Sequence, residues 1–212
     1  MAKAICIIGE SGAGKTTSLR NLDPQETFYI DADKKGGSWK GFSKQYNTEN
    51  RNYEATDDPN RVLALMKNIS EKTEIKYIVI DTLNGVMIGE EMRRCKEKGY
   101  DKWMDMAMHI YSILDVVSKL REDLTIIYTA HSETEYEEDG VLMTRMKTSG
   151  KKTKRLIPES KFNVVLLAKS INGRYIFETH SNNSTAKTPL DAFEEDEIPN
   201  DIVPVLKVLE EY

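Results

Sequence analysis

The feature that most constrains the fold is a glycine-rich loop that directly follows a short apolar run near the start of the chain. The run is residues 4–8, Ala-Ile-Cys-Ile-Ile, and the loop reads Gly-Glu-Ser-Gly-Ala-Gly-Lys-Thr. A loop of the form G-x-x-x-x-G-K-T between a strand and a helix binds phosphate, because its glycines let successive backbone N–H groups point at anionic oxygens. The residues predicted to bind a nucleotide are Gly9, Glu10, Ser11, Gly12, Ala13, Gly14, Lys15, Thr16 and Thr17.

Three side chains of this loop have predicted roles at the phosphates. The Lys15 ammonium is expected to reach the β- and γ-phosphates of ATP, and the Thr16 hydroxyl to bind Mg²⁺. Thr17 is expected to donate to the α-phosphate. A helix predicted from about Lys15 to Leu22 would add the positive end of its dipole. The alternative for the whole motif is an ordinary glycine-rich turn between a strand and a helix.

The composition fits one folded domain. Residues 1–212 are 39% hydrophobic and are predicted to form a single P-loop domain around one sizeable core. Cys6 and Cys95 lack metal-ligand spacing and are expected to be reduced thiols in a cytoplasm. There is no signal-peptide pattern and no run of about 18 apolar residues, so no membrane association is expected. The net charge of −5 argues against non-specific binding of nucleic acid.

Apolar runs and turn signals predict strands that alternate with helices. Asp58-Pro59 predicts a helix start, and Asn172-Gly173 between two later apolar runs predicts an antiparallel hairpin. The order predicts an α/β fold with a mainly parallel sheet, flanked by helices, and an antiparallel hairpin at one edge. An acidic segment, about 191–212, is expected to be an exposed loop followed by a helix. The predicted strands are 27–31, 77–81 and 124–130, and the later predicted helices lie within 84–120, broken near Gly99, and at 202–211.

Two carboxylates follow predicted parallel strands, where ligand-binding residues gather. Asp81 ends the strand 77–81 and is predicted to hold Mg²⁺ with Thr16; a helix N-cap is its alternative role. The next residue is Thr82 and not a glutamate, so a general base for hydrolysis must come from another strand end. Asp33, just after the strand 27–31, is the candidate, with a capped loop acid as its alternative.

His131 is predicted to end the strand 124–130, and a charged loop follows it. At that position its side chain could sense a γ-phosphate and pass the signal to the loop; a merely hydrogen-bonded histidine is the alternative. The loop begins with acids and becomes basic over about 140–161, which suggests a mobile arm for single-stranded nucleic acid, against the alternative of a solvated hairpin. The predicted nucleic-acid-binding residues are Arg145, Lys147, Lys151, Lys152, Lys154 and Arg155.

A lysine near the end of the predicted hairpin is a further catalytic candidate. Lys187, in Ser-Thr-Ala-Lys-Thr-Pro, could reach the nucleotide of a neighbouring subunit in the manner of an arginine finger. Lys169 and Arg174 are rivals for this role, and an ordinary surface lysine in a turn is the alternative.

Taken together, these motifs resemble the RecA-like ATPases, and among them the small phage ATPases of the Sak type, implicated in single-strand annealing and recombination. The resemblance rests on the loop at 9–17, the strand ends at Asp33, Asp81 and His131, and Lys187. It implies a RecA-like core that binds ATP and Mg²⁺, a slow ATPase that DNA stimulates, and a DNA-binding loop at about 144–161. RecA-like proteins carry glutamate where this chain has Asp33 and commonly glutamine where it has His131, and these two differences accompany the expectation of slow hydrolysis.

The implied partners are single-stranded DNA, further copies of the chain in a ring or filament, and a single-strand-binding protein. The implied location is the cytoplasm, that of the host if a phage encodes the chain. Two other functions remain open. One is a nucleotide-switched helicase loader or adaptor, and the other is a P-loop kinase acting on a small molecule.

Overall fold

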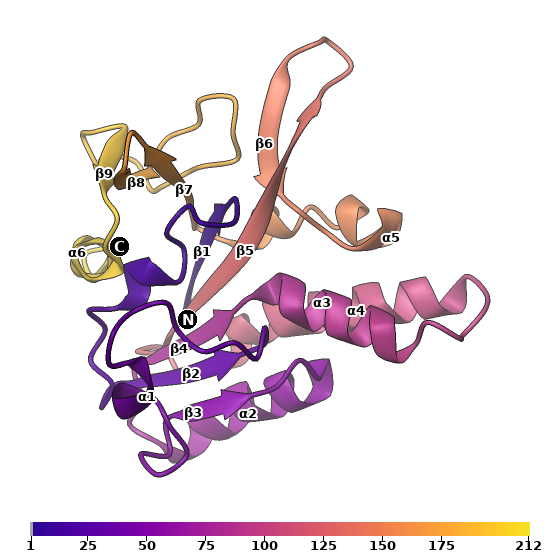
Figure 1. Ribbon diagram of the computed structural model, residues 1–212, viewed down its shortest axis with the longest axis horizontal. Coiled ribbons are helices and arrows are strands. Elements are labelled where there is room, and N and C mark those ends of the chain that lie inside the picture. The colour runs from indigo at the N-terminus through magenta and orange to yellow at the C-terminus, as the bar shows by residue number, and fades with distance from the viewer. Residues whose placement is uncertain (1) are drawn as a thin grey trace.

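The computed structural model describes residues 2–212, apart from the side chains of Lys151 and Lys152. Within this part of the chain nine strands form one sheet, in the order β3-β2-β4-β5-β1-β7-β8-β9, with β6 paired to β5 outside that path (Figure 1). The strands are β1 (Lys3–Gly9), β2 (Thr27–Asp31), β3 (Tyr53–Ala55), β4 (Tyr77–Asp81), β5 (Thr125–Tyr136), β6 (Leu142–Met146), β7 (Val164–Ile171), β8 (Arg174–Glu178) and β9 (Glu197–Pro199). The helices are α1 (Phe42–Gln45), α2 (Pro59–Lys72), α3 (Leu83–Arg93), α4 (Asp101–Asp115), α5 (Gly150–Arg155) and α6 (Ile202–Leu209), with 3₁₀ turns η1 (Thr17–Leu19), η2 (Val116–Lys119) and η3 (Pro158–Lys161).

The sheet is parallel from β3 to β7 and antiparallel at the β8–β9 edge, which confirms the predicted fold class. The central strands are apolar on both faces because each face packs against its own cluster. In β4, Ile78 and Ile80 join the cluster under α2, α3 and α4, whereas Val79 joins the cluster that includes residues of α6, α1 and η1. The two clusters hold the parallel strand ends in place.

Several local sequence patterns predicted elements that the structure contains. Asp58 caps α2 by accepting a hydrogen bond of 2.9 Å from the Asn60 amide, and Pro59 takes the first helical position. Asn172 and Gly173 adopt φ values of 51° and 79°, as the two-residue turn between β7 and β8 requires. The helical stretch before β5 is interrupted near Gly99, as expected, and α6 closes the chain.

The predicted helix from Lys15 to Leu22 is wrong. Only the three-residue turn η1 forms there, held largely by bonds between residues three apart, such as Leu19 N to Thr16 O at 3.2 Å. The Ser18 hydroxyl donates to the Lys15 carbonyl at 2.6 Å, and this competes with the helical pattern. Pro24 follows closely and prevents the segment from extending. The phosphate loop therefore lacks the long helix dipole that the sequence suggested.

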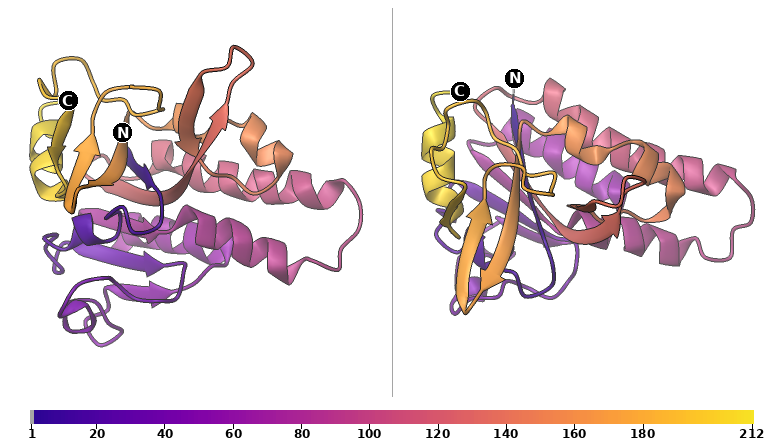
Figure 2. Two further views of the ribbon diagram at one scale, coloured as in Figure 1. Left: turned by 45° about the horizontal axis from the view of Figure 1, so that its top comes forward. Right: turned by 90° about the horizontal axis from the view of Figure 1, so that it is seen from above.

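The end predicted for the β5 strand is wrong, and the segment predicted as a loop after it contains regular structure. β5 continues through His131 to Tyr136 and pairs antiparallel with β6, and 140–161 also contains α5 and η3. The hairpin projects beyond the rest of the sheet in Figure 1 and in the left view of Figure 2. Cross-strand contacts between polar side chains stabilise it, including Thr134 with Thr144 at 2.9 Å and an ion pair between Glu137 and Arg145.

None of the helices described here is long and apolar enough to cross a membrane. The acidic segment before α6 is not a simple loop, because it contains β9, whose Ile198 pairs with Phe177.

Candidate functional site

The phosphate loop curls around its own lysine. Gly12 and Gly14 have φ values of 81° and 95°, a region that favours glycine. At Gly14 an added Cβ would lie 2.9 Å from the Tyr175 ring, so this position also lacks room for a side chain. Lys15 is 6% exposed, and its ammonium donates to the carbonyls of Gly9 and Glu10 at 2.8 Å each. The loop is thus shaped around a cation before any phosphate arrives.

The buried position of Lys15 disfavours the charged form of its side chain. Burial lowers its pKa to about 8, although the negative charge of Asp81 opposes this shift. The ammonium is therefore mostly protonated at neutral pH, and a phosphate group beside it would favour the charged form further.

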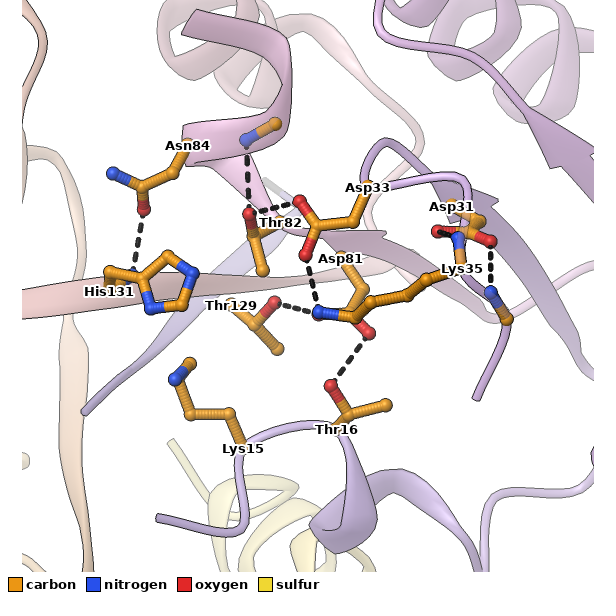
Figure 3. A network of polar contacts seen from close by, with 12 residues as sticks. Lys15, Thr16, Asp31, Asp33, Lys35, Asp81, Thr82, Asn84, Thr129 and His131 are labelled. Carbon is orange, nitrogen blue, oxygen red and sulfur yellow. Dashed lines mark hydrogen bonds and ion pairs between the residues drawn. The ribbon is translucent and has the colours of Figure 1, made fainter. Parts of the chain in front are cut away.

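Asp81, 1% exposed, lies at the end of β4 among three hydroxyl groups, and Figure 3 shows those of Thr16 and Thr129. It accepts hydrogen bonds from Thr16 at 2.9 Å, from Thr129 at 2.5 Å and from Tyr29 at 2.5 Å. Burial, with Asp81 adding to it, raises the pKa of Tyr29, so that hydroxyl stays a donor. These contacts orient one carboxylate oxygen towards the Thr16 hydroxyl.

The pairing of Thr16 with Asp81 fits the magnesium ligands that the sequence predicted. Both groups offer hard oxygen donors, and Mg²⁺ at nucleotide sites takes one or two protein ligands alongside waters and phosphate oxygens. Among the residues described, no group of three or more His, Cys, Asp or Glu side chains could hold a metal by itself. The donor set thus suits an ion that arrives with a nucleotide.

Asp33 lies beside this pair, held by two neighbours. Its carboxylate accepts from the Thr82 hydroxyl at 2.8 Å and from the Lys35 ammonium at 2.6 Å. Burial favours the neutral acid, but the hydrogen bonds from Lys35 and Thr82 outweigh it and lower the pKa of Asp33. Asp33 is therefore ionised but a weaker base than a free carboxylate, and its part in hydrolysis stays a prediction.

His131 lies across the cavity, near Lys15 (Figure 3). Burial and the charge of Lys15 lower the pKa of its imidazole, while Asp33 partly opposes them. The ring is neutral at pH 7 and makes no hydrogen bond with the described residues, so it is free to contact a ligand. Its backbone is fixed, because its amide donates to the Asn84 side chain at 2.7 Å.

Lys15, Thr16 and His131 line a cavity of about 240 Å³, and Asp81 and Asp33 contact its lining residues Thr16 and Thr82. The cavity brings together the loop residues, Thr82 and His131, together with three residues that were not predicted from the sequence, Lys35, Ser38 and Tyr175. Lys35 had a signal, since it follows Asp31 and Asp33 within a few residues. Thr129 was also missed, although a hydroxyl inside an apolar strand two residues before His131 was a usable sign. Tyr175 lay on the predicted hairpin, with no local sign of its contact with Gly14.

The predicted nucleic-acid residues lie on or just after the hairpin, but some of their charge is neutralised. Arg145 pairs with Glu137, and Lys154 with Glu133 and Glu135. Lys147 and Arg155 are exposed and form no ion pair with the described side chains. The side chains of the predicted Lys151 and Lys152 lie outside the described residues.

Lys187 is exposed and does not line the cavity of its own chain; its backbone pairs with Val165. Of its rivals, Lys169 is engaged by the buried Glu178, and Arg174 is exposed beside the β7–β8 turn. The intrachain site is therefore formed without any of the three.

The comparison with curated proteins finds no match. A family model described as an AAA domain matches residues 1–190, a range that includes the phosphate loop, Asp33, Asp81, His131 and Lys187. The matched range and the cavity around Lys15 and Asp81 agree on a nucleotide-binding core. The chain therefore belongs to the AAA domain family of P-loop ATPases.

Proposed function

We propose that the chain is a Mg²⁺-dependent ATPase that binds single-stranded DNA and acts in recombination or strand annealing, like the phage ATPases of the Sak type that it resembles. The observation that carries the proposal is the position of His131. This residue lies in the nucleotide cavity and also at the base of the projecting hairpin, because β5 runs through both.

Several residues in and beside the cavity have a role in the proposed reaction. Thr16 and Asp81 would hold Mg²⁺, which neutralises phosphate charge when bound. Lys15 would exchange its two carbonyl partners for phosphate oxygens, and the backbone amides of the loop would orient the nucleotide. Asp33 is the proposed base for the attacking water, and its lowered pKa would keep hydrolysis slow.

The proposed DNA surface is the basic side of the hairpin and α5. Lys147 and Arg155 offer free cationic side chains there, and phosphate contacts supply most of the affinity for single strands. The acids at 137–139 place like charge at the tip, so we propose that DNA follows the base of the hairpin and avoids its tip. Cytoplasmic location and contact with a single-strand-binding protein belong to the same proposal.

We further propose that the working form is a ring or filament of identical chains. Lys187 is exposed and lies outside its own chain's cavity, as a residue that completes a neighbour's site would be.

Binding of a fluorescent oligo-dT tests the DNA proposal directly. Fluorescence anisotropy with Mg²⁺ and a non-hydrolysable ATP analogue should give an affinity that falls with salt, and Lys147→Ala/Arg155→Ala should reduce the logarithmic salt slope by about 1.4, roughly 0.7 for each lost contact. Lys67→Ala/Lys207→Ala, which removes two exposed lysines from α2 and α6, is the matched control and should leave the slope unchanged. An unchanged slope in the first variant would exclude this surface.

A second function, the nucleotide-switched adaptor, is favoured by the tip of the hairpin. Tyr136 is 75% exposed, and Val141 and Leu142 beside it are also exposed. Exposed apolar side chains that cluster on a projecting element suit a protein partner better than a phosphate backbone. Oligo-dT binding that is absent with and without nucleotide would favour this function.

A further inference from the structure

One buried side chain connects the nucleotide cavity to β5 and to the residue that directly follows β6. Asn84, 3% exposed, accepts a hydrogen bond of 2.7 Å from the His131 amide and donates one of 2.8 Å to the Lys147 carbonyl (Figure 3 shows the bond to His131). His131 and Lys147 are themselves joined, since the Lys147 amide donates to the His131 carbonyl at 2.7 Å. The three residues form a closed ring of hydrogen bonds at the base of the hairpin.

The ring lies where β5 changes partners. His131 is paired with Gly9, the first residue of the phosphate loop, in the parallel sheet. The next residue, Ser132, already pairs with Met146 in the antiparallel hairpin. Asn84 therefore contacts the one position of β5 that belongs to the nucleotide site on one side and leads into the hairpin on the other.

Asn84 lies three residues after Asp81, the carboxylate proposed to hold Mg²⁺. Asp81 ends β4, and Thr82 caps α3, with its hydroxyl accepting from the Gly85 amide at 3.0 Å and donating to Asp33. Asn84 follows in the first turn of α3. A change in the contacts of Asp81, Thr82 or Asp33 when nucleotide binds would thus move the start of the helix that holds the hairpin base.

We propose that Asn84 is a positioning residue that couples nucleotide binding at the phosphate loop to the position of the β5–β6 hairpin. The inference rests on the nucleotide binding of the proposed function but not on its DNA binding. Linkage makes the coupling reciprocal, so whatever binds the hairpin would change nucleotide affinity through the same contact.

The test measures hydrogen exchange of amides 132–147 in the full chain, with and without Mg²⁺ and a non-hydrolysable ATP analogue. In the wild type the nucleotide should slow exchange in this segment by about fivefold or more, the lower end of coupling between linked sites. Asn84→Ala removes both contacts, and Asn84→Asp removes the donor to Lys147 while keeping the acceptor for His131. Both variants should bind a fluorescent ATP analogue nearly as well as the wild type and lose most of the change in exchange.

Asn52→Ala is the matched control for a general loss of stability. Asn52 is also a buried asparagine, 4% exposed, and it joins separate segments through bonds of 2.9 Å to Pro24 O and 2.8 Å to Gln45 O, away from the hairpin. This variant should keep the nucleotide-dependent change.

Three outcomes would overturn the coupling. They are a wild type that binds nucleotide without a change in hairpin exchange, Asn84 variants that keep the full change, and an equal loss in Asn52→Ala. A wild type that binds no nucleotide would instead refute the proposed function, and the coupling with it.

Discussion

At the scale of single residues, the central feature of the site is Lys15, a buried cation that contacts carbonyl oxygens of its own loop. Its ammonium rests on two carbonyl oxygens and its pKa is lowered to about 8, mainly by burial. Nucleotide binding must therefore both replace these two contacts and stabilise the charged form. This combination makes affinity depend on pH in a defined direction.

Affinity for a fluorescent ATP analogue should fall as pH rises above about 8. Below that pH the lysine of the free protein already carries its proton, whereas above it binding must take up a proton, so affinity declines by up to about tenfold per pH unit. Titrations between about pH 7.5 and 9.5 measure this slope.

Lys15→Arg is the control, because a guanidinium stays charged over the whole range. It should bind more weakly but with an affinity that does not change with pH. A wild-type affinity that is equally flat would show that Lys15 does not titrate in the free protein.

At the scale of elements, the hairpin shows how acidic and basic residues from neighbouring segments of the sequence pair with one another when the chain folds. The acids after His131 and the bases after Leu142 read as two separate blocks, but Lys154 of α5 lies against Glu133 and Glu135 of β5. Exposed pairs of this kind stabilise folding by only about 0–1 kcal/mol. Their larger effect is to withhold a cation from any ligand.

Glu133→Gln/Glu135→Gln should therefore leave the unfolding temperature nearly unchanged and tighten binding of oligo-dT. One extra phosphate contact by the freed Lys154 corresponds to a gain of up to roughly tenfold at low salt. Anisotropy titrations measure it. Glu26→Gln/Glu54→Gln, which frees Lys76 and Arg61 elsewhere on the chain, should have little effect. A similar gain in both double variants would mean that net charge alone governs binding.

Elements with a strong local signal were predictable from the sequence. The apolar runs of β2 and β4, the Asp58-Pro59 start of α2 and the Asn172-Gly173 turn each specify their structure within a few residues. Local sequence patterns failed where the secondary structure depends on a side-chain contact or on pairing with another strand. Ser18 diverts the predicted helix after the loop, and β5 extends past His131 only because β6 pairs with a segment that has no apolar pattern.

At the scale of the whole molecule, strand order makes the site. β5 lies between β1 and β4, so three groups come together: the phosphate loop at the end of β1, Asp81 at the end of β4, and His131 at the point where the parallel pairing of β5 ends. The sequence placed each residue at a strand end, but the order of strands depends on pairings between distant segments. For the same reason Lys35, Tyr175 and Asn84 could be assigned to the site and its surroundings only with the fold in hand.

The central claim is that one cavity both turns over ATP and responds to DNA. The most direct measurement is Mg²⁺-dependent ATP hydrolysis by the wild type and Lys15→Ala, with and without oligo-dT. We predict turnover that the oligonucleotide raises by about fivefold or more, and a loss of at least about a hundredfold in Lys15→Ala with or without DNA. Turnover that oligo-dT leaves unchanged, or that persists in Lys15→Ala, would contradict the account.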